Sequence, residues 1–125
     1  MGYASRRPRV LVADADEDAL TRTALRLGRA GYEVLVARDG EEALARATSE
    51  QPDLCLLDAM MPKLSGYDVT RRLRADARTR GVRVLLMTAQ RRIAGGRDAG
   101  ADGFMHKPCS PHELRTRVGA LLARR

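Results

Sequence analysis

Short apolar runs alternate with stretches of helical periodicity along most of the chain. Five of these runs are continuous rather than alternating, which is typical of strands buried on both faces of a sheet. They span residues 9–13, 32–37, 54–57, 82–87 and 103–106. Between them, apolar residues recur at spacings of three and four, as on one face of a helix. This β-α alternation predicts a doubly wound, five-stranded parallel sheet with helices on both faces.

The predicted helices have their own boundary signals. Gly31 marks the end of the first helix. Capping-box patterns, a polar cap followed three residues later by Glu, begin the second helix at Asp39 and the last helix at Ser110. Ser65 can cap the third helix. The inward side chains of this third helix are predicted to be Tyr67, Val69, Leu73 and Ala77.

The fourth helix is the weakest element of the pattern. Little room lies between Thr88 and Gly100 for a helix. Within this segment, Gly95 and Gly96 each disfavour helix by about 1 kcal/mol relative to alanine. We therefore expect the fourth helix to be short or frayed.

Composition limits the kind of protein that the chain can form. With 125 residues, 44% of them apolar, it can bury a core without disulfides or metals. We expect a flexible arm over residues 1–8 and a single domain over residues 9–125. No stretch approaches the ~20 apolar residues of a membrane span. Cys55 and Cys109 suggest neither a disulfide framework nor a zinc site with the two histidines, so we expect a cytoplasmic protein without a membrane partner.

The net charge of +7 comes from 23 basic residues, nearly all of them arginines spread along the chain. An acidic partner is conceivable. Only 3% of the residues are aromatic, so few rings accompany the arginines for stacking on bases. We interpret the arginines as solvated residues on helix faces, and nucleic acid is not an expected partner.

Polar side chains stand where four of the predicted strands end. Asp14 ends the first strand, Asp58 the third, Thr88 the fourth and Lys107 the fifth. The carboxyl ends of parallel strands form one edge of a sheet, where ligands bind. Taken singly, an Asp or Thr after a strand is often only a helix cap or a turn former. Together, the four predict a site.

The chemistry that such a set supports is phosphoryl transfer to a carboxylate. Asp58 would be the nucleophile, and Asp14 would help to hold Mg²⁺, which often uses only one or two protein carboxylates. Lys107 would pair with a phosphoryl oxygen, and the Thr88 hydroxyl would bond to another.

These residues belong to segments that resemble the receiver domains of bacterial response regulators. The segments are Val10 to Asp14, Pro52 to Pro62, Gly66, Val84 to Ala89 and Gly100 to Pro108. The resemblance covers almost the whole chain and implies a flavodoxin-like sheet of order 2-1-3-4-5. It matches Asp58 to the phosphoacceptor, Thr88 to the switch hydroxyl, Phe104 to the switch aromatic and Lys107 to the phosphate-binding lysine. The Met60 backbone carbonyl matches a metal ligand, beside Asp14 and Asp58.

The resemblance also implies partners. A histidine kinase or phosphotransfer protein would be the phosphoryl donor, and a downstream protein would read a surface that phosphorylation switches. The protein would be a monomer or a phosphorylation-dependent homodimer, and its only chemistry would be its own phosphorylation and dephosphorylation. Phe104 stands where tyrosine is more common, so the switch would be read mainly by packing, or Phe104 simply fills the core.

Two features depart from the family. Receivers usually place a second acidic residue after the first, but here Ala15 follows Asp14. Asp16 could substitute as a metal ligand, or it could simply cap the first helix. We expect weak Mg²⁺ binding and slow phosphotransfer.

The second departure is the short segment after Thr88, which in receivers forms the fourth helix and part of the partner-binding face. The downstream partner would therefore bind another surface. The chain resembles a stand-alone receiver or one cut from a longer chain.

Two other functions remain open. Asp14 and Asp16 also resemble the nucleophile and acid-base pair of haloacid-dehalogenase phosphatases, but that reading leaves Asp58 without a role. Alternatively, the chain is a phosphorylation-independent module that docks an arginine-rich face on an acidic protein or nucleic acid. Ala15 and the short fourth segment favour this module, whereas Asp58, Thr88 and Lys107 favour a phosphorylated receiver.

Overall fold

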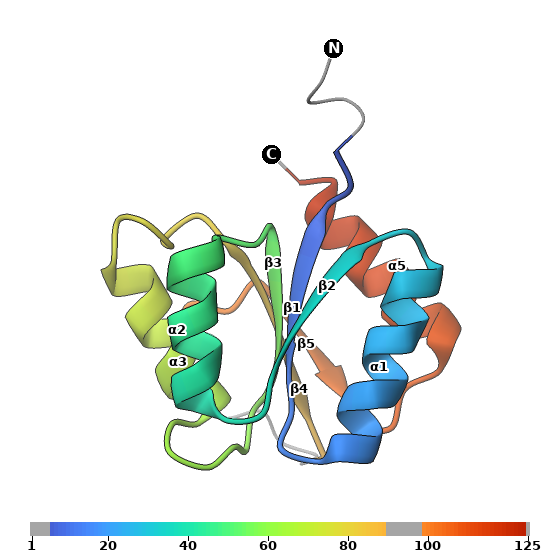
Figure 1. Ribbon diagram of the computed structural model, residues 1–125, viewed down its shortest axis with the longest axis horizontal. Helices are drawn as coiled ribbons and strands as arrows, with labels where there is room; N and C mark the ends of the chain where they lie inside the picture. The colour runs from blue at the N-terminus through green and yellow to red at the C-terminus, as the bar shows by residue number, and fades with distance from the viewer. Residues whose placement is uncertain (1–5, 90–98, 125) are drawn as a thin grey trace.

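The sheet has five parallel strands in the order β2-β1-β3-β4-β5, as the resemblance implies (Figure 1). A computed structural model describes residues 6–89 and 99–124 of the chain. Its strands are β1 (Arg9–Ala13), β2 (Glu33–Ala37), β3 (Leu54–Asp58), β4 (Arg83–Thr88) and β5 (Gly103–His106). The predicted runs differ from these bounds by at most one residue.

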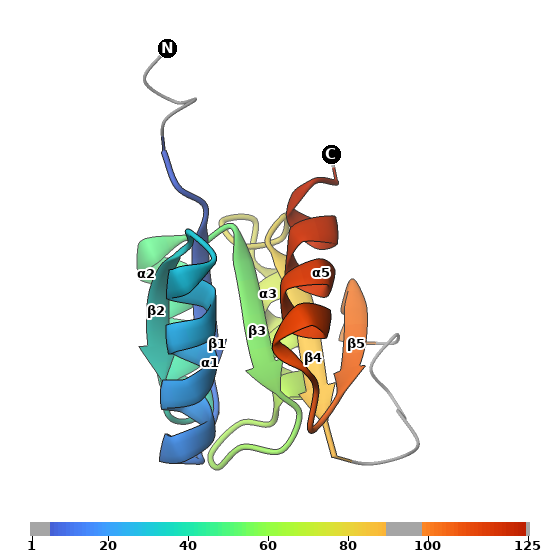
Figure 2. The same ribbon diagram turned by 90° about the vertical axis from the view of Figure 1, so that its right-hand side faces the viewer.

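Helices cover both faces of the sheet, as the β-α alternation predicts. They are α1 (Glu17–Arg29), α2 (Gly40–Glu50), α3 (Gly66–Ala75) and α5 (Pro111–Leu122). The helices α1 and α5 lie on one face, and α2 and α3 lie on the other (Figures 1 and 2). The predicted fourth helix falls largely on residues 90–98, which lie outside the described residues.

Side-chain caps set the starts of the helices. The Asp39 carboxylate accepts the amide of Glu42, and the Ser65 and Ser110 hydroxyls accept the amides three residues after them. These three predicted caps are confirmed. The prediction of Ala77 as an inward residue is wrong, because α3 ends at Ala75 and Asp76 adopts an extended conformation. Ala77 is therefore exposed.

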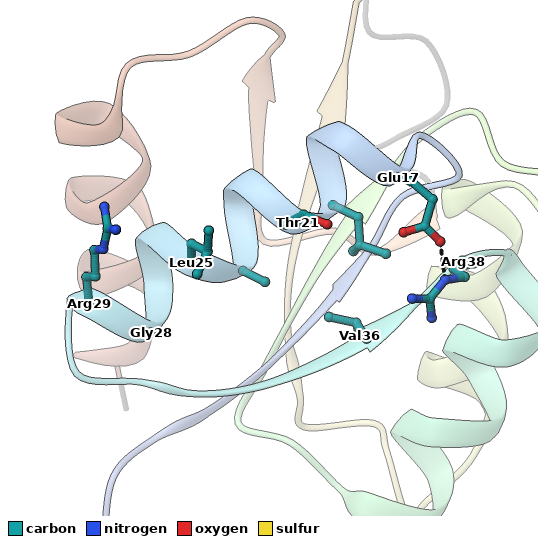
Figure 3. A pocket seen from close by; sticks show the side chains of 9 residues that line it. Glu17, Thr21, Leu25, Gly28, Arg29, Val36 and Arg38 are labelled. Atoms are coloured by element: carbon teal, nitrogen blue, oxygen red, sulfur yellow. Dashed lines mark hydrogen bonds and ion pairs between the residues drawn. The ribbon is translucent and has the colours of Figure 1, made fainter.

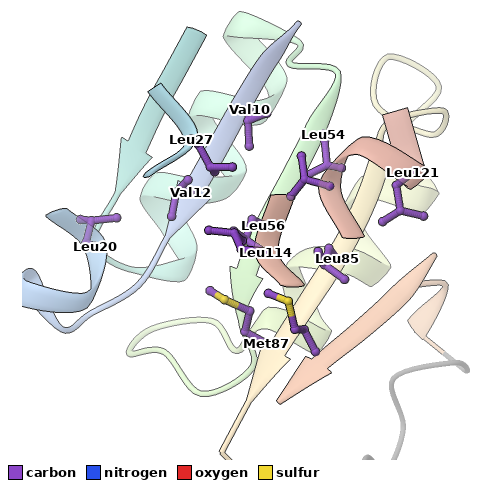
Figure 4. Close-up of a cluster of buried hydrophobic side chains, with 12 residues drawn as sticks. Val10, Val12, Leu20, Leu27, Leu54, Leu56, Leu85, Met87, Leu114 and Leu121 are labelled. Atoms are coloured by element: carbon purple, nitrogen blue, oxygen red, sulfur yellow. The ribbon is translucent and has the colours of Figure 1, made fainter. Parts of the chain in front are cut away.

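Two apolar clusters fill the space between the sheet and its helices. Successive residues of β1 point to opposite faces, so Val10 and Val12 join one cluster and Leu11 joins the other. The first cluster lies under α1 and α5 and includes Leu20, Leu27, Leu114 and Leu121 (Figure 4). The second lies under α2 and α3. Burial on both faces explains why the strands read as continuous apolar runs.

The open edge of the sheet at β2 is partly covered by α2. Arg46 of α2 donates from Nη1 to the Val36 carbonyl at 3.1 Å. Just beyond the strand, the Arg38 amide donates to Glu42 Oε1 at 2.7 Å. The neighbouring strand β1 uses other groups of β2, since the Asp14 amide bonds to the Ala37 carbonyl. One backbone group of the edge strand β2 and one just beyond it are thus bonded by side chains of α2.

Candidate functional site

The four predicted strand-end residues converge at the carboxyl edge of the sheet. Asp14 directly follows β1, Asp58 and Thr88 are the last residues of β3 and β4, and Lys107 directly follows β5. The strands β3, β4 and β5 are adjacent in the sheet, and the Lys107 amide donates to the Thr88 carbonyl at 2.8 Å. Register therefore brings residues that are far apart in the chain to one place.

The Lys107 ammonium bridges two carboxylates. Its Nζ lies 2.8 Å from Asp14 Oδ2 and 3.5 Å from Asp58 Oδ2. The side chain of Asp14 is 2% exposed, that of Asp58 is 14% exposed, and that of Lys107 is 27% exposed. Two carboxylates and one ammonium leave the trio with one net negative charge. Of the two carboxylates, Asp58 is the more accessible.

Local backbone amides orient the remaining carboxylate oxygens. Asp14 Oδ1 accepts the amide of Asp16 at 3.0 Å, and Asp58 Oδ1 accepts the amide of Met60 at 3.3 Å. Each carboxylate thus has one oxygen fixed by the turn that follows it and the other facing Lys107. This arrangement directs both carboxylates toward the same small volume.

Burial and neighbouring charges shift the pKa values of Asp58 and Lys107. Burial raises the pKa of Asp58 above its ordinary value; Lys107 lowers this pKa and the nearby Asp14 carboxylate raises it, and the balance stays upward. Burial lowers the pKa of Lys107, but its hydrogen bond to Asp14 and the charge of Asp58 outweigh burial and raise it. Both shifts reflect one buried and one partly buried carboxylate that share one cation, and the raised pKa of Lys107 keeps its ammonium charged.

Asp16 is engaged as the cap of α1. Its Oδ1 accepts the amides of Asp18 at 3.0 Å and Ala19 at 3.3 Å. These bonds satisfy two of the free amides at the start of the helix. The Ala15 side chain, which replaces the usual second carboxylate, is exposed and offers no oxygen. A metal role for Asp16 stays a prediction.

Thr88 and Phe104, the predicted switch residues, lie on neighbouring strands but in different surroundings. Thr88 is buried at the end of β4, with 1% exposure. Phe104 is half-buried on β5 and packs against the cluster under α2 and α3. Arg117 of α5 donates to the Phe104 carbonyl at 3.1 Å. Their switch roles stay predictions.

Gly66, the first residue of α3, allows a close approach to the site. A Cβ atom there would lie 2.5 Å from the Asp58 carbonyl oxygen and 2.9 Å from a methyl group of Leu86. The Gly66 amide also donates to the Ala59 carbonyl at 2.9 Å. The sequence identifies Gly66 only through the family resemblance, because a single glycine at a helix start has no periodic signal of its own.

The donor set fits a hard cation. The site offers oxygen donors from Asp14 and Asp58, which Mg²⁺ prefers and can use together with water. In the described part of the chain, no group of three or more His, Cys, Asp or Glu side chains forms a metal cluster. The described residues of the site therefore offer two carboxylates, from Asp14 and Asp58, together with backbone carbonyls.

A separate cavity of about 470 Å³ lies between α1 and β2. Leu25 and Gly28 of α1 and Val36 of β2 line it, and an ion pair between Glu17 and Arg38 lies at one end (Figure 3). None of its lining residues belongs to the strand-end site. The cavity is mainly apolar and offers no obvious nucleophile.

Comparison with known proteins identifies the family. The sequence pattern of the response regulator receiver domain matches residues 10–119. The chain is 42% identical over 120 residues to the DNA-binding dual master transcriptional regulator RpaA of Synechocystis sp., covering 94% of this chain and 50% of that protein. The chain spans about half the length of the curated relatives it matches. Because RpaA is described as DNA-binding, the expectation that nucleic acid is not a partner lacks support.

Solved structures agree with the sequence comparison. A protein from Chloroflexus aurantiacus, described as a response regulator, has a TM-score of 0.90 and 36% identity, covering 95% of this chain and 100% of its own. The receiver domain of the sensor histidine kinase PA1611 from Pseudomonas aeruginosa has a TM-score of 0.89 and 25% identity, covering 95% and 100%. That structure has a magnesium ion coordinated in its active-site cleft.

The curated relatives are described as transcriptional regulators rather than as metabolic enzymes. No helix in the described part of the chain is long and apolar enough to cross a membrane. The chain belongs to the response regulator receiver domain family of two-component signal transduction.

Proposed function

We propose that this chain is a phosphorylation-dependent receiver in which Asp58 accepts a phosphoryl group from a histidine kinase or a phosphotransfer protein. The observation that carries this proposal is the bridged trio, because it directs an accessible carboxylate and a fixed ammonium toward one volume. We further propose that residues 9–125 form one receiver domain after an arm of residues 1–8. The two free cysteines are consistent with a cytoplasmic location.

Asp58 is the better nucleophile of the two carboxylates. Its side chain is 14% exposed, whereas that of Asp14 is 2% exposed and bonded to Lys107 at 2.8 Å. A phosphoryl donor can therefore reach Asp58 more easily. This difference argues against a phosphatase that would use Asp14 as its nucleophile.

The transfer forms one bond and breaks one. A carboxylate oxygen of Asp58 attacks phosphorus, the bond from phosphorus to the donor imidazole breaks, and its electron pair returns to the imidazole nitrogen. Lys107 would exchange its contact with Asp58 for a phosphoryl oxygen, and the Thr88 hydroxyl would bond to another. Asp14, Asp58 and the Met60 carbonyl would hold Mg²⁺, which when bound neutralises charge on the transferring oxygens.

Phosphorylation would then change a surface. Lys107 and Thr88 belong to the ends of β5 and β4, and Phe104 lies on β5, so a new dianion at Asp58 acts on both strands. Reorientation of Phe104 would alter how the second apolar cluster meets the surface. A downstream protein, or a second copy in a homodimer, would read this change.

Intact-mass measurement tests the proposal. After incubation with acetyl phosphate and Mg²⁺, we expect the wild type to gain one phosphoryl group of about 80 Da and Asp58→Asn to gain none. Asp14→Asn should still be modified, more slowly, because it loses only a metal-binding and positioning group. An unmodified wild type, or modification abolished by Asp14→Asn and retained in Asp58→Asn, would overturn the assignment.

A phosphorylation-independent module is the second candidate. It is favoured by one observation, namely that Ala15 offers no oxygen while Asp16 is engaged as the α1 cap. Both candidate functions predict weak Mg²⁺ binding. A Mg²⁺ titration followed by NMR measures this affinity without phosphorylation, but it does not distinguish the two candidates. The substitution Ala15→Asp should strengthen Mg²⁺ binding and speed phosphorylation if the receiver function is retained. A wild type that binds its partner equally with and without acetyl phosphate would favour the module.

A further inference from the structure

Charge is distributed unequally between the two helical layers. Over the whole of α2 and α3, four acidic and four basic residues balance: Glu41, Glu42, Glu50 and Asp68 against Arg46, Arg71, Arg72 and Arg74. On the other face, the acids of α1 and α5 are confined to the first turn of each helix. Over the whole of α1 and α5, three acidic residues stand against five basic ones: Glu17, Asp18 and Glu113 against Arg22, Arg26, Arg29, Arg115 and Arg117.

The arginines of the two layers also differ in their contacts. In and just after α3, Arg71, Arg74 and Arg78 each form an ion pair, with Asp68, Asp102 and Asp76, whereas the exposed Arg72 forms none among the described residues. By contrast, four arginines on α1 and α5 make no hydrogen bond or ion pair among the described residues: Arg22, Arg26, Arg29 and Arg115. We call these four the α1/α5 arginine set. Their guanidinium groups are available to an external anion.

Helix geometry places the α1 members of this set in a row. Arg22, Arg26 and Arg29 are separated by four and three residues, which puts them on one side of α1 about 6 and 4.5 Å apart along its axis. Arg115 lies on α5, which shares the same apolar cluster and the same face of the sheet (Figure 2). All of the set except the half-buried Arg26 are exposed. The layer therefore presents a row of basic side chains, and the acidic residues of α1 and α5 lie in the first turns of the two helices.

We propose that the face of α1 and α5 binds the phosphate backbone of duplex nucleic acid. Duplex DNA carries about one negative charge per 1.7 Å of axis, and the planar fork of arginine matches phosphate oxygens. Only 3% of the residues are aromatic, so stacking on the bases of a single strand is not the mode of binding. Contacts to phosphate alone carry no sequence information, so binding is independent of sequence. This inference does not depend on phosphorylation of Asp58.

Fluorescence anisotropy with a labelled 20-base-pair duplex of arbitrary sequence tests the proposal, using the full chain without phosphorylation. We expect binding at 50 mM NaCl that weakens steeply toward 200 mM. The triple variant R22Q/R29Q/R115Q removes three exposed arginines that have no internal partner, so the fold should persist, as circular dichroism and thermal unfolding can verify. Its affinity should fall at least 10-fold, and its log-log salt slope should decrease in magnitude by about 3.

A matched triple, R71Q/R72Q/R78Q, changes the net charge equally on the opposite layer. It should reduce affinity by less than 3-fold. Equal losses in the two triples would show that only net charge matters and would overturn the assignment to this face. No binding by the wild type at 50 mM NaCl would overturn the proposal entirely. Unlabelled polyglutamate and unlabelled duplex can also be compared as competitors at equal charge concentration. If polyglutamate competes as well as the duplex, the face binds acidic proteins, and the proposal of nucleic acid as its ligand is overturned.

Discussion

At the scale of single residues, the main determinant of the site is how three charged groups share a small, partly buried volume. Lys107 compensates one of two negative charges, so the site retains an excess negative charge before any ligand binds. That excess favours a divalent cation and disfavours an incoming phosphoryl dianion. The two effects explain in electrostatic terms why Mg²⁺ and Lys107 would both be needed for transfer to Asp58.

Replacing Lys107 by methionine should raise the pKa of Asp58 further, because Lys107 lowers that pKa while burial and Asp14 raise it. The acid limb of the phosphorylation rate should move to higher pH, and the rate at neutral pH should fall by about 10-fold or more, as expected from lost charge stabilisation. A carboxyl ¹³C titration measures the pKa. Lys63→Met, at the other lysine of the chain, is the control, and an unchanged Asp58 pKa in Lys107→Met would contradict the account.

The sequence could predict which residues form the site, but it could not predict which of these residues contact one another. Asp14, Asp58, Thr88 and Lys107 could be predicted because each stands at the end of an apolar run. The contact between Lys107 and Asp14 joins residues 93 positions apart, and it depends on side-chain directions that no run of apolar residues encodes. The cap role of Asp16 was one of two alternatives, and the hydrogen bonds that its carboxylate accepts from nearby amides favour the cap.

At the scale of elements, the site depends on how closely α3 approaches the end of β3. Gly66→Ala should destabilise the protein by roughly 1–3 kcal/mol, because its new methyl group would overlap the Asp58 carbonyl and Leu86. It should also slow phosphorylation of Asp58, since α3 must shift away from the strand. Urea unfolding and intact-mass kinetics measure the two effects. Gly28→Ala on α1, where an added Cβ meets nothing within 4 Å, should show neither loss.

The cap of α2 should make stability depend on pH in the acid range. The Glu42 amide, donating to Asp39, holds the pKa of that carboxyl below its ordinary value, and nearby Lys63 contributes. A folded pKa below the unfolded value of about 3.9 means that the stabilisation is complete above this pH and is lost as pH falls through the folded pKa. Between pH 4 and pH 2, the melting temperature of the wild type should therefore fall more than that of Asp39→Asn. Parallel curves for the two proteins would contradict this.

Element boundaries could be predicted where a cap or a stop residue marks them. Asp39, Ser65 and Ser110 mark helix starts correctly, since each side chain can bond a free amide three residues later. The apolar spacing continues formally to Ala77, so it predicts an inward residue beyond the end of α3 at Ala75. The local bonds of Asp76 to Arg78 and to the Arg78 amide favour a turn there, and sequence periodicity does not detect them.

At the scale of the whole molecule, Arg74 joins segments that are distant in the chain. Its guanidinium donates to the carbonyls of Gly100, Arg80 and Val82, and to the carboxylate of Asp102. Asp102 also accepts the amide of Val84 at the start of β4. One side chain of α3 thus connects the loop before β4 with the approach to β5, and therefore helps to position the strand that precedes Lys107.

Arg74→Leu should destabilise the protein by about 2 kcal/mol or more, because it removes a donor from three carbonyls and one of two donors from Asp102. The guanidinium group is about one-fifth exposed, so solvent compensates in part. The free energy of unfolding in urea measures this. Arg71→Leu, which removes an exposed pair with Asp68 on the same helix, should change the free energy by less than about 0.5 kcal/mol. Equal effects of the two substitutions would reject the linking role of Arg74.

The layered architecture was predictable from alternation alone, but the asymmetry between its layers was not. The arginines look evenly spread in the sequence, and only the structure separates those paired with acids from those without partners. The same holds for Arg74, whose four acceptors come from two segments, the loop before β4 and the residues before β5. Pairwise contacts across the fold, rather than composition, distinguish these arginines.

The partly covered edge at β2 has a consequence for how the protein can aggregate. An incoming strand from another molecule would find the Val36 carbonyl and the Arg38 amide already engaged by α2, so the native sheet is a poor template for extension on that side. The protection lasts only while α2 stays docked. A partly opened molecule with α2 detached would expose the bare edge, so aggregation should begin from that transient species rather than from the native fold.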